Sequence, residues 1–114
     1  MDLDILPDPE VSVARACGDV THAAAADFQS RLAEALGATR ALVLDFSGLG
    51  LLTSAGLRAL LMLHRQAAGA GRSLVLAAVP AGVREVMEVT GFWEHFAHQP
   101  SVDAARVALA GSAP

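Results

Sequence analysis

The sequence of 114 residues contains one cysteine, no tyrosine and no lysine. A single cysteine cannot form an internal disulfide, and without a cysteine cluster the chain is neither a disulfide scaffold nor a zinc module of the cysteine-rich kind. Aromatic residues make up only 4% of the chain, so a hydrophobic core must be built from Leu, Val and Ala. With ten glycines and five prolines, a collagen-like chain is excluded as well.

Basic charge is also scarce. Eight arginines, spread from Arg15 to Arg106, are outnumbered by twelve acidic residues, which gives a formal net charge of −4. A chain of this charge offers no basic patch for a phosphate backbone, so we expect no direct contact with nucleic acid. Hydrophobic residues make up 54% of the sequence and charged residues 18%, a balance that excludes a disordered chain.

Long hydrophobic runs are absent as well. No uninterrupted apolar stretch approaches the roughly 20 residues of a membrane span. The first ten residues, MDLDILPDPE, are acidic where a signal peptide carries basic residues. We therefore expect one domain over residues 1–114, with its core at about 3–110 and a short tail at 111–114. We also expect a cytoplasmic location without membrane insertion.

What the sequence does contain is an alternation of strand and helix patterns. Strands are predicted at 3–5, 11–17, 41–45, 74–79 and 96–98, and helices after Thr21, from about Ser54 to 69, at 83–87 and at 102–109. Residues 41–44 and 74–79 are continuously apolar, which is typical of strands buried on both faces. Because helices connect these strands, the sequence predicts βαβ units and a largely parallel sheet. The first strand can pair antiparallel with the second through the turn at Pro7-Asp8-Pro9, which makes the sheet mixed.

The same periodicities predict the hydrophobic core. Its expected side chains are Val11, Val13, Phe28, Leu32, Leu42, Leu44, Leu57, Leu60, Leu61, Leu74, Leu76, Val83 and Met87.

The segment from Leu44 to Arg58 lies between a predicted strand and a predicted helix. Residues 46–52 are expected to form a loop, and Ser54 stands at the start of the helix. There its hydroxyl can cap free backbone N–H groups, which stabilises a helix by about 1 kcal/mol. A phosphate on the same hydroxyl would meet the positive end of the helix, with Arg58 four residues further along. The residues alone leave both roles open.

Several motifs in this chain resemble those of STAS domains, specifically the bacterial anti-sigma factor antagonists. The stretch LVLDFSGLGLLTSAGLRALL at 42–61 is similar to the signature of that family. Residues 18–21 (GDVT) resemble its Gly-Glu-Leu-Asp turn, and residues 90–92 (TGF) resemble its Thr-Gly-Leu corner. Residues 53–57 (TSAGL) resemble its Ser-Ser-Ala-Gly-Leu motif, in which the serine matched by Ser54 is phosphorylated. The likeness extends from the strand at Val11 to the helix at Leu109.

Two positions depart from the family pattern. Thr21 replaces an aspartate that is usual in the partner-facing loop. Thr53 replaces an aspartate found in many members, and it places a second hydroxyl beside Ser54 as the less favoured phosphorylation site. Neither change affects the implied fold, an α/β STAS fold with a mixed, mostly parallel sheet of four to five strands and about four helices packed mainly on one face.

The resemblance implies a regulator. The unphosphorylated domain would bind an anti-sigma factor, a serine kinase with a GHKL-type ATP site, and release its sigma factor. Phosphorylation of Ser54 would weaken binding, and a PP2C-type phosphatase would restore it. Because parallel strands bring their carboxyl-end loops to one edge, we expect the partner surface there. Its predicted residues are Asp19, Thr21, Ser47, Leu49, Thr53, Ser54, Arg58 and Met62.

Two other functions remain open at this point. The domain would alternatively be a STAS subunit of a lipid or other ABC transporter, in which Ser54 is not modified. A third possibility is a ligand-sensing module that binds a nucleotide or lipid at residues 47–54.

Enzyme sites are not indicated by the sequence. Ser54 does not lie in a Gly-x-Ser-x-Gly elbow, because position 52 is leucine. Gly48 and Gly50 do not begin a Gly-x-Gly-x-x-Gly motif, because position 53 is threonine. His95 and His98 are spaced like a metal-binding pair but lack further ligands nearby in the sequence. We expect no catalytic residue, no metal and no cofactor.

Overall fold

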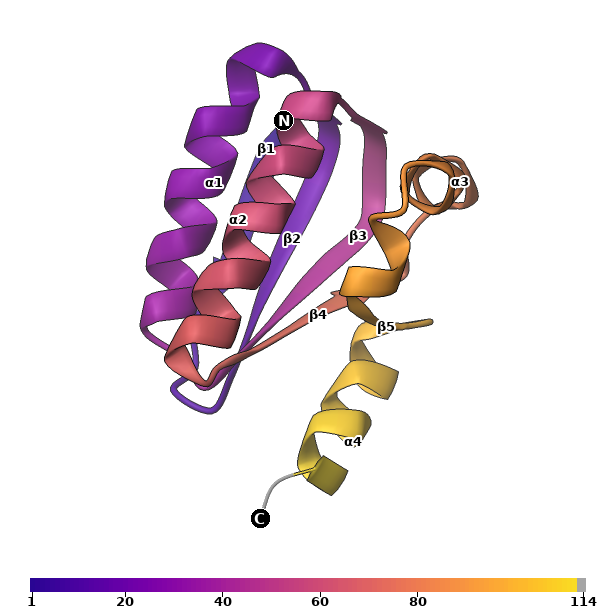
Figure 1. Cartoon of the computed structure of the whole chain (residues 1–114). Coiled ribbons are helices and arrows are strands. Elements are labelled where there is room, and N and C mark those ends of the chain that lie inside the picture. The colour runs from indigo at the N-terminus through magenta and orange to yellow at the C-terminus, as the bar shows by residue number, and fades with distance from the viewer. Residues whose placement is uncertain (113–114) are drawn as a thin grey trace.

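The computed structural model describes residues 1–112. Its five strands form one sheet (Figure 1). The strands are β1 (Asp2–Leu6), β2 (Val11–Val20), β3 (Ala41–Leu52), β4 (Ser73–Ala77) and β5 (Ala97–Gln99). The helices are α1 (His22–Gly37), α2 (Ser54–Ala70), α3 (Ala81–Val89) and α4 (Val102–Ser112), with a short 3-10 helix, η1, at Trp93–His95. The strand order is β1-β2-β3-β4-β5, with β1 antiparallel to β2 and the other pairs parallel. The predicted mixed, mostly parallel α/β fold is confirmed.

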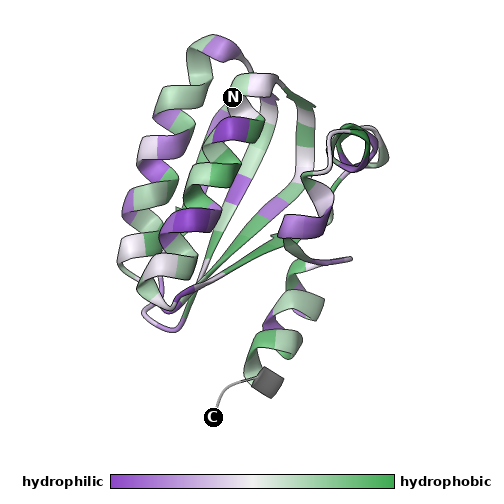
Figure 2. Ribbon diagram, viewed as in Figure 1, coloured by the Kyte–Doolittle hydropathy of each residue, from purple (hydrophilic) through white to green (hydrophobic). Residues whose placement is uncertain are grey.

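The two faces of the sheet are covered unequally. On one face, α1, α2 and α3 bury side chains such as Phe28, Leu60 and Met87 against the sheet. On the opposite face, α4 packs Ala105 against Val43 and its neighbours. Figure 2 shows β4 as almost wholly hydrophobic, as expected for a strand covered on both sides. Three of the four helices therefore share one face, in agreement with the prediction.

The predicted core is largely confirmed. Eleven of its side chains are buried: Val13, Phe28, Leu32, Leu42, Leu44, Leu57, Leu60, Leu74, Leu76, Val83 and Met87. Val11 is half-buried but packs against the core side chains on the face of α4, whereas half-buried Leu61 belongs to neither part of the core, so its assignment was wrong. Val11 opens β2 at the margin of the sheet, and Leu61 lies on the flank of α2 rather than on its buried stripe.

The turn between β1 and β2 is held by hydrogen bonds around Asp8. Its carboxylate accepts from the backbone N–H groups of Glu10, at 2.8 Å, and of Val11, at 3.3 Å. These two donors hold the pKa of Asp8 below its ordinary value. The carbonyl of Asp8 accepts from the hydroxyls of Ser12 and Thr39, so both buried hydroxyls are satisfied. The turn predicted at Pro7-Asp8-Pro9 therefore places the antiparallel strand as expected.

The strand β3 is much longer than the sequence predicted. The expected loop at 46–52 is instead the second half of β3, paired with the extended end of β2 from Cys17 to Val20. The prediction failed because Gly48 and Gly50 resemble loop residues. In the structure the side chains of β2 fill the space beside these glycines: a Cβ at Gly48 would lie 2.7 Å from Cys17 Sγ, and one at Gly50 would lie 2.6 Å from Asp19 Oδ1.

Smaller differences occur in the second half of the chain. The strand predicted at 74–79 ends at Ala77, because Ala78 has a φ of +54° and cannot continue an extended strand. The strand predicted at 96–98 is displaced by one residue, to Ala97–Gln99. The helix α4 includes Gly111 and Ser112, which were assigned to the tail, and residues 113–114 lie outside the described part of the chain.

The contact of α2 with the sheet depends on Gly56, and this can be tested. A Cβ there would lie 2.6 Å from Leu52 Cδ1 and 3.1 Å from Val20 Cγ1, two buried side chains. A Cβ at Gly69 in the same helix would have nothing within 4 Å, so this glycine serves as a matched control. Both substitutions to alanine gain about 1 kcal/mol of helix propensity. Overpacking at position 56 should cost about 1–3 kcal/mol.

We therefore expect Gly56→Ala to have a lower free energy of unfolding than Gly69→Ala by about 1–3 kcal/mol. Urea denaturation followed by circular dichroism measures this difference. Equal stability of the two variants would show that α2 does not depend on close approach at Gly56.

Candidate partner-binding site

The candidate site lies where β2 and β3 end and α1 and α2 begin. The strands are parallel, so their carboxyl ends reach the same edge of the sheet. Thr53 ties this edge together, because its backbone N–H and its hydroxyl both donate to the carbonyl of Val20, at 3.2 and 2.8 Å. The start of α2 is thereby fixed to the end of β2.

Thr53, and not Ser54, is the N-cap of α2. It has extended backbone angles, φ −75° and ψ 171°, and its hydroxyl accepts from the N–H of Gly56 at 3.4 Å. Of the two roles that the sequence left open for Ser54, the capping role therefore belongs to Thr53, one residue earlier. The Thr53 hydroxyl both donates and accepts, so it is fully engaged in holding the helix.

Ser54 is the first residue of α2, and its side chain is exposed. Within residues 1–112 its hydroxyl makes no hydrogen bond, in contrast to that of its neighbour. Arg58 and Met62 follow at intervals of four residues and are also exposed, so the three side chains share one face of α2. The ion pairs of the described chain involve Arg31, Arg40 and Arg84, which leaves Arg58 available.

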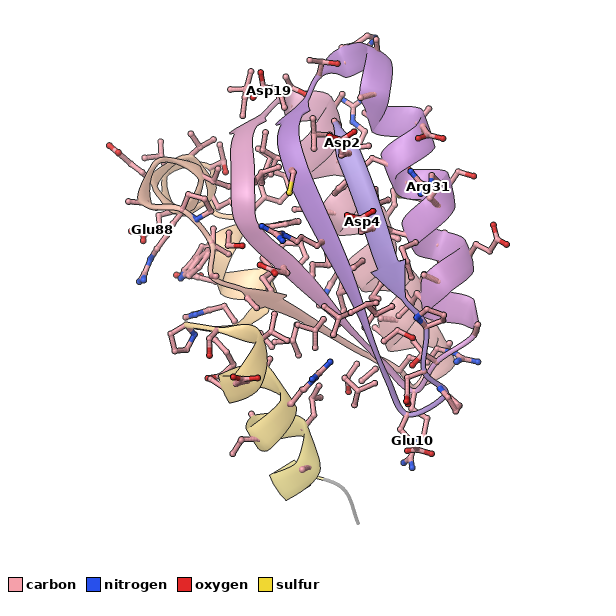
Figure 3. All side chains as sticks on the ribbon, turned by 180° about the vertical axis from the view of Figure 1, so that it is seen from behind. Asp2, Asp4, Glu10, Asp19, Arg31 and Glu88 are labelled. Carbon is pink, nitrogen blue, oxygen red and sulfur yellow. The ribbon has the colours of Figure 1, made fainter. Side chains whose placement is uncertain are left out.

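The other predicted polar residues are exposed but not all close to Ser54. Thr21 is the N-cap of α1, with its hydroxyl accepting from the N–H of Ala24 at 3.2 Å. Asp19 lies at the end of β2 against Gly50, and Figure 3 shows it at the edge of the sheet. Ser47 is different, because it lies five residues before the end of β3. At about 3.3 Å per residue, it is well below the edge that carries Ser54.

Leu49 does not contribute to this surface. Its side chain is only 4% exposed and belongs to the core, so its placement among surface residues was wrong. Instead Leu51 is 52% exposed, and Met62, a predicted partner-binding residue, is 44% exposed. One feature of the sequence could have indicated that Leu51 is exposed. It follows Gly50 in a glycine-rich segment, where buried and exposed side chains need not alternate regularly.

Leu49 is buried and Leu51 is exposed because the pairing of β3 with β2 is irregular at two places. Between Asp45 and Gly48, and again between Leu49 and Leu52, β3 advances three residues while β2 advances two. Each extra residue is a β-bulge, which changes the direction of side chains. Leu49 and Leu52 are both buried although they are three residues apart, and Leu51 turns outward.

The described chain shows no arrangement for metal binding. Among residues 1–112, no three His, Cys, Asp or Glu side chains lie together where they could hold a metal ion. The rings of His95 and His98 have different neighbours. The His95 ring centroid lies 6.3 Å from that of His64, and the His98 ring centroid lies 4.2 Å from that of Trp93. Within residues 1–112, no helix combines the length and the hydrophobicity that a membrane span requires.

Comparison with known sequences supports the same assignment as the motifs. A family model described as "Mlab, STAS domain" matches residues 7–97. BtrV of Bordetella bronchiseptica, which is named as a proposed anti-sigma factor antagonist, is 35% identical over 98 residues. These residues cover 85% of this chain and 84% of BtrV.

Solved structures show the same fold in proteins of different kinds. The anti-sigma factor antagonist SpoIIAA in its unphosphorylated form matches with a TM-score of 0.82 and 18% identity, over 99% of this chain and 100% of that chain. Its phosphorylated form, from Bacillus, has a TM-score of 0.72 and 18% identity, over 94% and 99%. The murine anion transporter Solute Carrier 26 family member A9 matches with a TM-score of 0.80 and 21% identity, over 90% of this chain but 18% of the transporter.

At these identities the structural matches show the fold alone, whereas the family model and BtrV carry the assignment by sequence. The chain belongs to the STAS-domain family, in the group of the anti-sigma factor antagonists.

Proposed function

We propose that the unphosphorylated protein binds an anti-sigma factor of the serine-kinase type and so releases a sigma factor, and that phosphorylation of Ser54 weakens this binding. The observation that carries the proposal is the Ser54 hydroxyl. It is exposed and unbonded at the start of α2, and it shares a helix face with Arg58 and Met62. The 35% identity to BtrV supports the class of partner.

The hydrogen bonds favour Ser54 over Thr53 as the phosphorylated residue. A phosphoryl group on Thr53 would replace the proton that is donated to Val20 and would disturb the cap on Gly56. The same group on Ser54 breaks no hydrogen bond of the described chain and adds negative charge at the positive end of α2. Modification at Ser54 therefore leaves the fold intact while changing its surface.

The chemistry needs two partner enzymes. A GHKL-type kinase domain in the anti-sigma factor would transfer the γ-phosphoryl group of ATP to Ser54 Oγ, which releases ADP and the hydroxyl proton. A PP2C-type phosphatase would hydrolyse the ester with water and restore the serine. Both enzymes would act in the cytoplasm, where we place this protein.

Charge and desolvation explain how the phosphate would weaken binding. A phosphoserine carries about −1.5 to −2 charges at neutral pH, and these must lose water if they are buried in an interface. Leu51, three residues before Ser54, and Met62, eight residues after it, are both exposed, and such apolar side chains favour a partly apolar contact. A hundredfold loss of affinity corresponds to about 2.7 kcal/mol, which one desolvated phosphate can supply.

A second function is supported by a separate observation. The same fold forms part of a murine anion transporter, so a docking subunit of a transporter is compatible with the architecture. That function would use the surface without any change at Ser54. Phosphorylation of Ser54 therefore distinguishes the two functions.

The phosphorylation site is tested with variants that differ at one hydroxyl each. Incubated with the GHKL-type kinase of the same organism and ATP, the protein should gain one phosphoryl group, and Ser54→Ala should gain none. Thr53→Asn should still be phosphorylated, since asparagine keeps a cap on α2 but has no hydroxyl. Intact-protein and peptide mass spectrometry locate the group. Phosphate on Thr53, or on a site retained in Ser54→Ala, would contradict the proposal.

The Ser54→Ala variant should also be as stable as the parent protein and should still bind the anti-sigma factor. Because Ser54 is not the cap and makes no hydrogen bond, the free energy of unfolding should change by less than about 0.5 kcal/mol. A fall of about 1 kcal/mol or more, the size of a lost cap, would indicate a structural role instead.

The apolar part of the surface gives an independent test. Leu51→Ser and Met62→Ser should each weaken binding of the anti-sigma factor by about tenfold, which is about 1.4 kcal/mol, while leaving stability unchanged. Val107→Ser is the matched control, because Val107 is 72% exposed on α4, the helix on the opposite face of the sheet. Isothermal titration calorimetry measures the three affinities. The surface is misassigned if Val107→Ser alone weakens binding.

A further inference from the structure

A second site lies away from Ser54, beside the C-terminal half of α2. There the structure contains an open cavity of about 490 Å³, a size typical of small-molecule pockets. Its walls come from α2, the first residues of β4, η1, β5 and α4. Since Ser54 is the first residue of the 17-residue helix α2 and the cavity begins at His64, the two sites are separate.

The cavity exists because β5 is short. It pairs only with residues 75–77 of β4, so Ser73 and Leu74 have no strand beside them on that side. Figure 1 shows β5 next to the second half of β4 only, with α4 continuing beyond it. The space that a longer strand would fill is left open between α2 and α4.

Basic side chains line this cavity. His64 comes from α2, Arg72 from the turn before β4, and His95 from η1. The rings of His64 and His95 have centroids 6.3 Å apart, and His64 is held edge-on against Phe96 at 5.3 Å. Arg72 is anchored through its Nη1, which donates to the carbonyl of Thr39. A guanidinium has five N–H donors, so others stay available.

Acidic side chains do not line this cavity within the described chain, although the sequence has twelve of them. An imidazole donates a hydrogen bond when neutral and is cationic when protonated, and a guanidinium group is a cationic donor. The polar lining therefore complements an oxyanion.

The remaining wall is apolar. It includes Ala67, Leu74, Val75 and Ala108, of which the first three are buried in the fold. A free inorganic anion would leave this wall in contact with water. A ligand with an apolar chain attached to the anion would cover it, because burial of methylene groups against an apolar wall is favourable.

From the paired imidazoles, the arginine in the lining and the apolar wall together, we propose that this cavity binds an anionic amphiphile, with a carboxylate or phosphate head at His64 and His95 and an apolar chain along Ala67 and Leu74. The site is independent of the function proposed for Ser54, and neither depends on the other.

Titration of the full-length, 15N-labelled chain tests the proposal. The probes are decanoate and decyl phosphate, each below its micelle concentration, with decanol and inorganic phosphate as controls. We expect amide shifts at Ala67, Ser73, Leu74 and Ala97 with at least one of the two amphiphiles. Decanol and inorganic phosphate should bind at least fivefold more weakly, because each lacks one of the two recognised parts.

Variants at histidines separate the site from a general apolar surface. His64→Gln combined with His95→Gln should weaken amphiphile binding at least fivefold. His22→Gln, at the start of α1, is the matched control and should leave it unchanged. The proposal is overturned if neither amphiphile shifts these amides, if decanol or phosphate alone binds as well, or if the double variant binds like the parent. A circular dichroism melt of each variant identifies any loss of folding, and in that case His95→Gln alone, at an exposed position, replaces the double variant and should still weaken amphiphile binding.

Discussion

The bulged pairing of β2 with β3 is the constraint on which the candidate partner-binding site depends. Up to Asp45 the strands run in simple register, and beyond it β3 carries two extra residues. In this part of the pairing, the side chains of Cys17 and Asp19 occupy the positions that a Cβ at Gly48 or Gly50 would approach within 3 Å. Because this pairing continues to Leu52, β3 delivers Thr53 to the carbonyl of Val20, and the start of α2 is fixed at the edge of the sheet.

At this edge of the sheet, the neighbouring hydroxyls of Thr53 and Ser54 have different roles: the first makes structural hydrogen bonds and the second lies on the surface. Thr53 holds the chain, since it bonds both the end of β2 and the first turn of α2. Ser54 is thereby relieved of a capping role and is left exposed. A cap contributes about 1 kcal/mol, so a modified cap would couple phosphorylation to the stability of α2. With the cap one residue earlier, a phosphate on Ser54 changes the surface and leaves the helix in place.

Features that depend on local sequence were predictable, and features that depend on distant pairing were not. The strands at 41–45 and 74–77 follow from continuous apolar runs, and most of the core follows from periodicity. The second half of β3 contains two glycines and has no regular alternation, and it is a strand only because β2 lies beside it. The exchange of Leu49 for Leu51 at the surface has the same origin. Which side chain is exposed depends on where the bulges lie in β3, and their location cannot be read from a single sequence.

The helix α2 connects the proposed phosphorylation site with the proposed ligand cavity, but a shared helix is not in itself a mechanism of coupling. Leu57, Leu60, Leu63 and Ala67 are buried along its whole length, so the helix is fixed on the sheet at both ends. A ligand changes a distant site only by binding two states of the protein with different affinity. The described chain presents one packed position for α2, with Gly56 against Leu52 at one end and His64 against Phe96 further along. Independence of the two sites is therefore the physical expectation. Coupling would require a second packed position of α2. The ligand of the cavity would then change the affinity for the anti-sigma factor, and the anti-sigma factor would change the affinity for the ligand by the same factor.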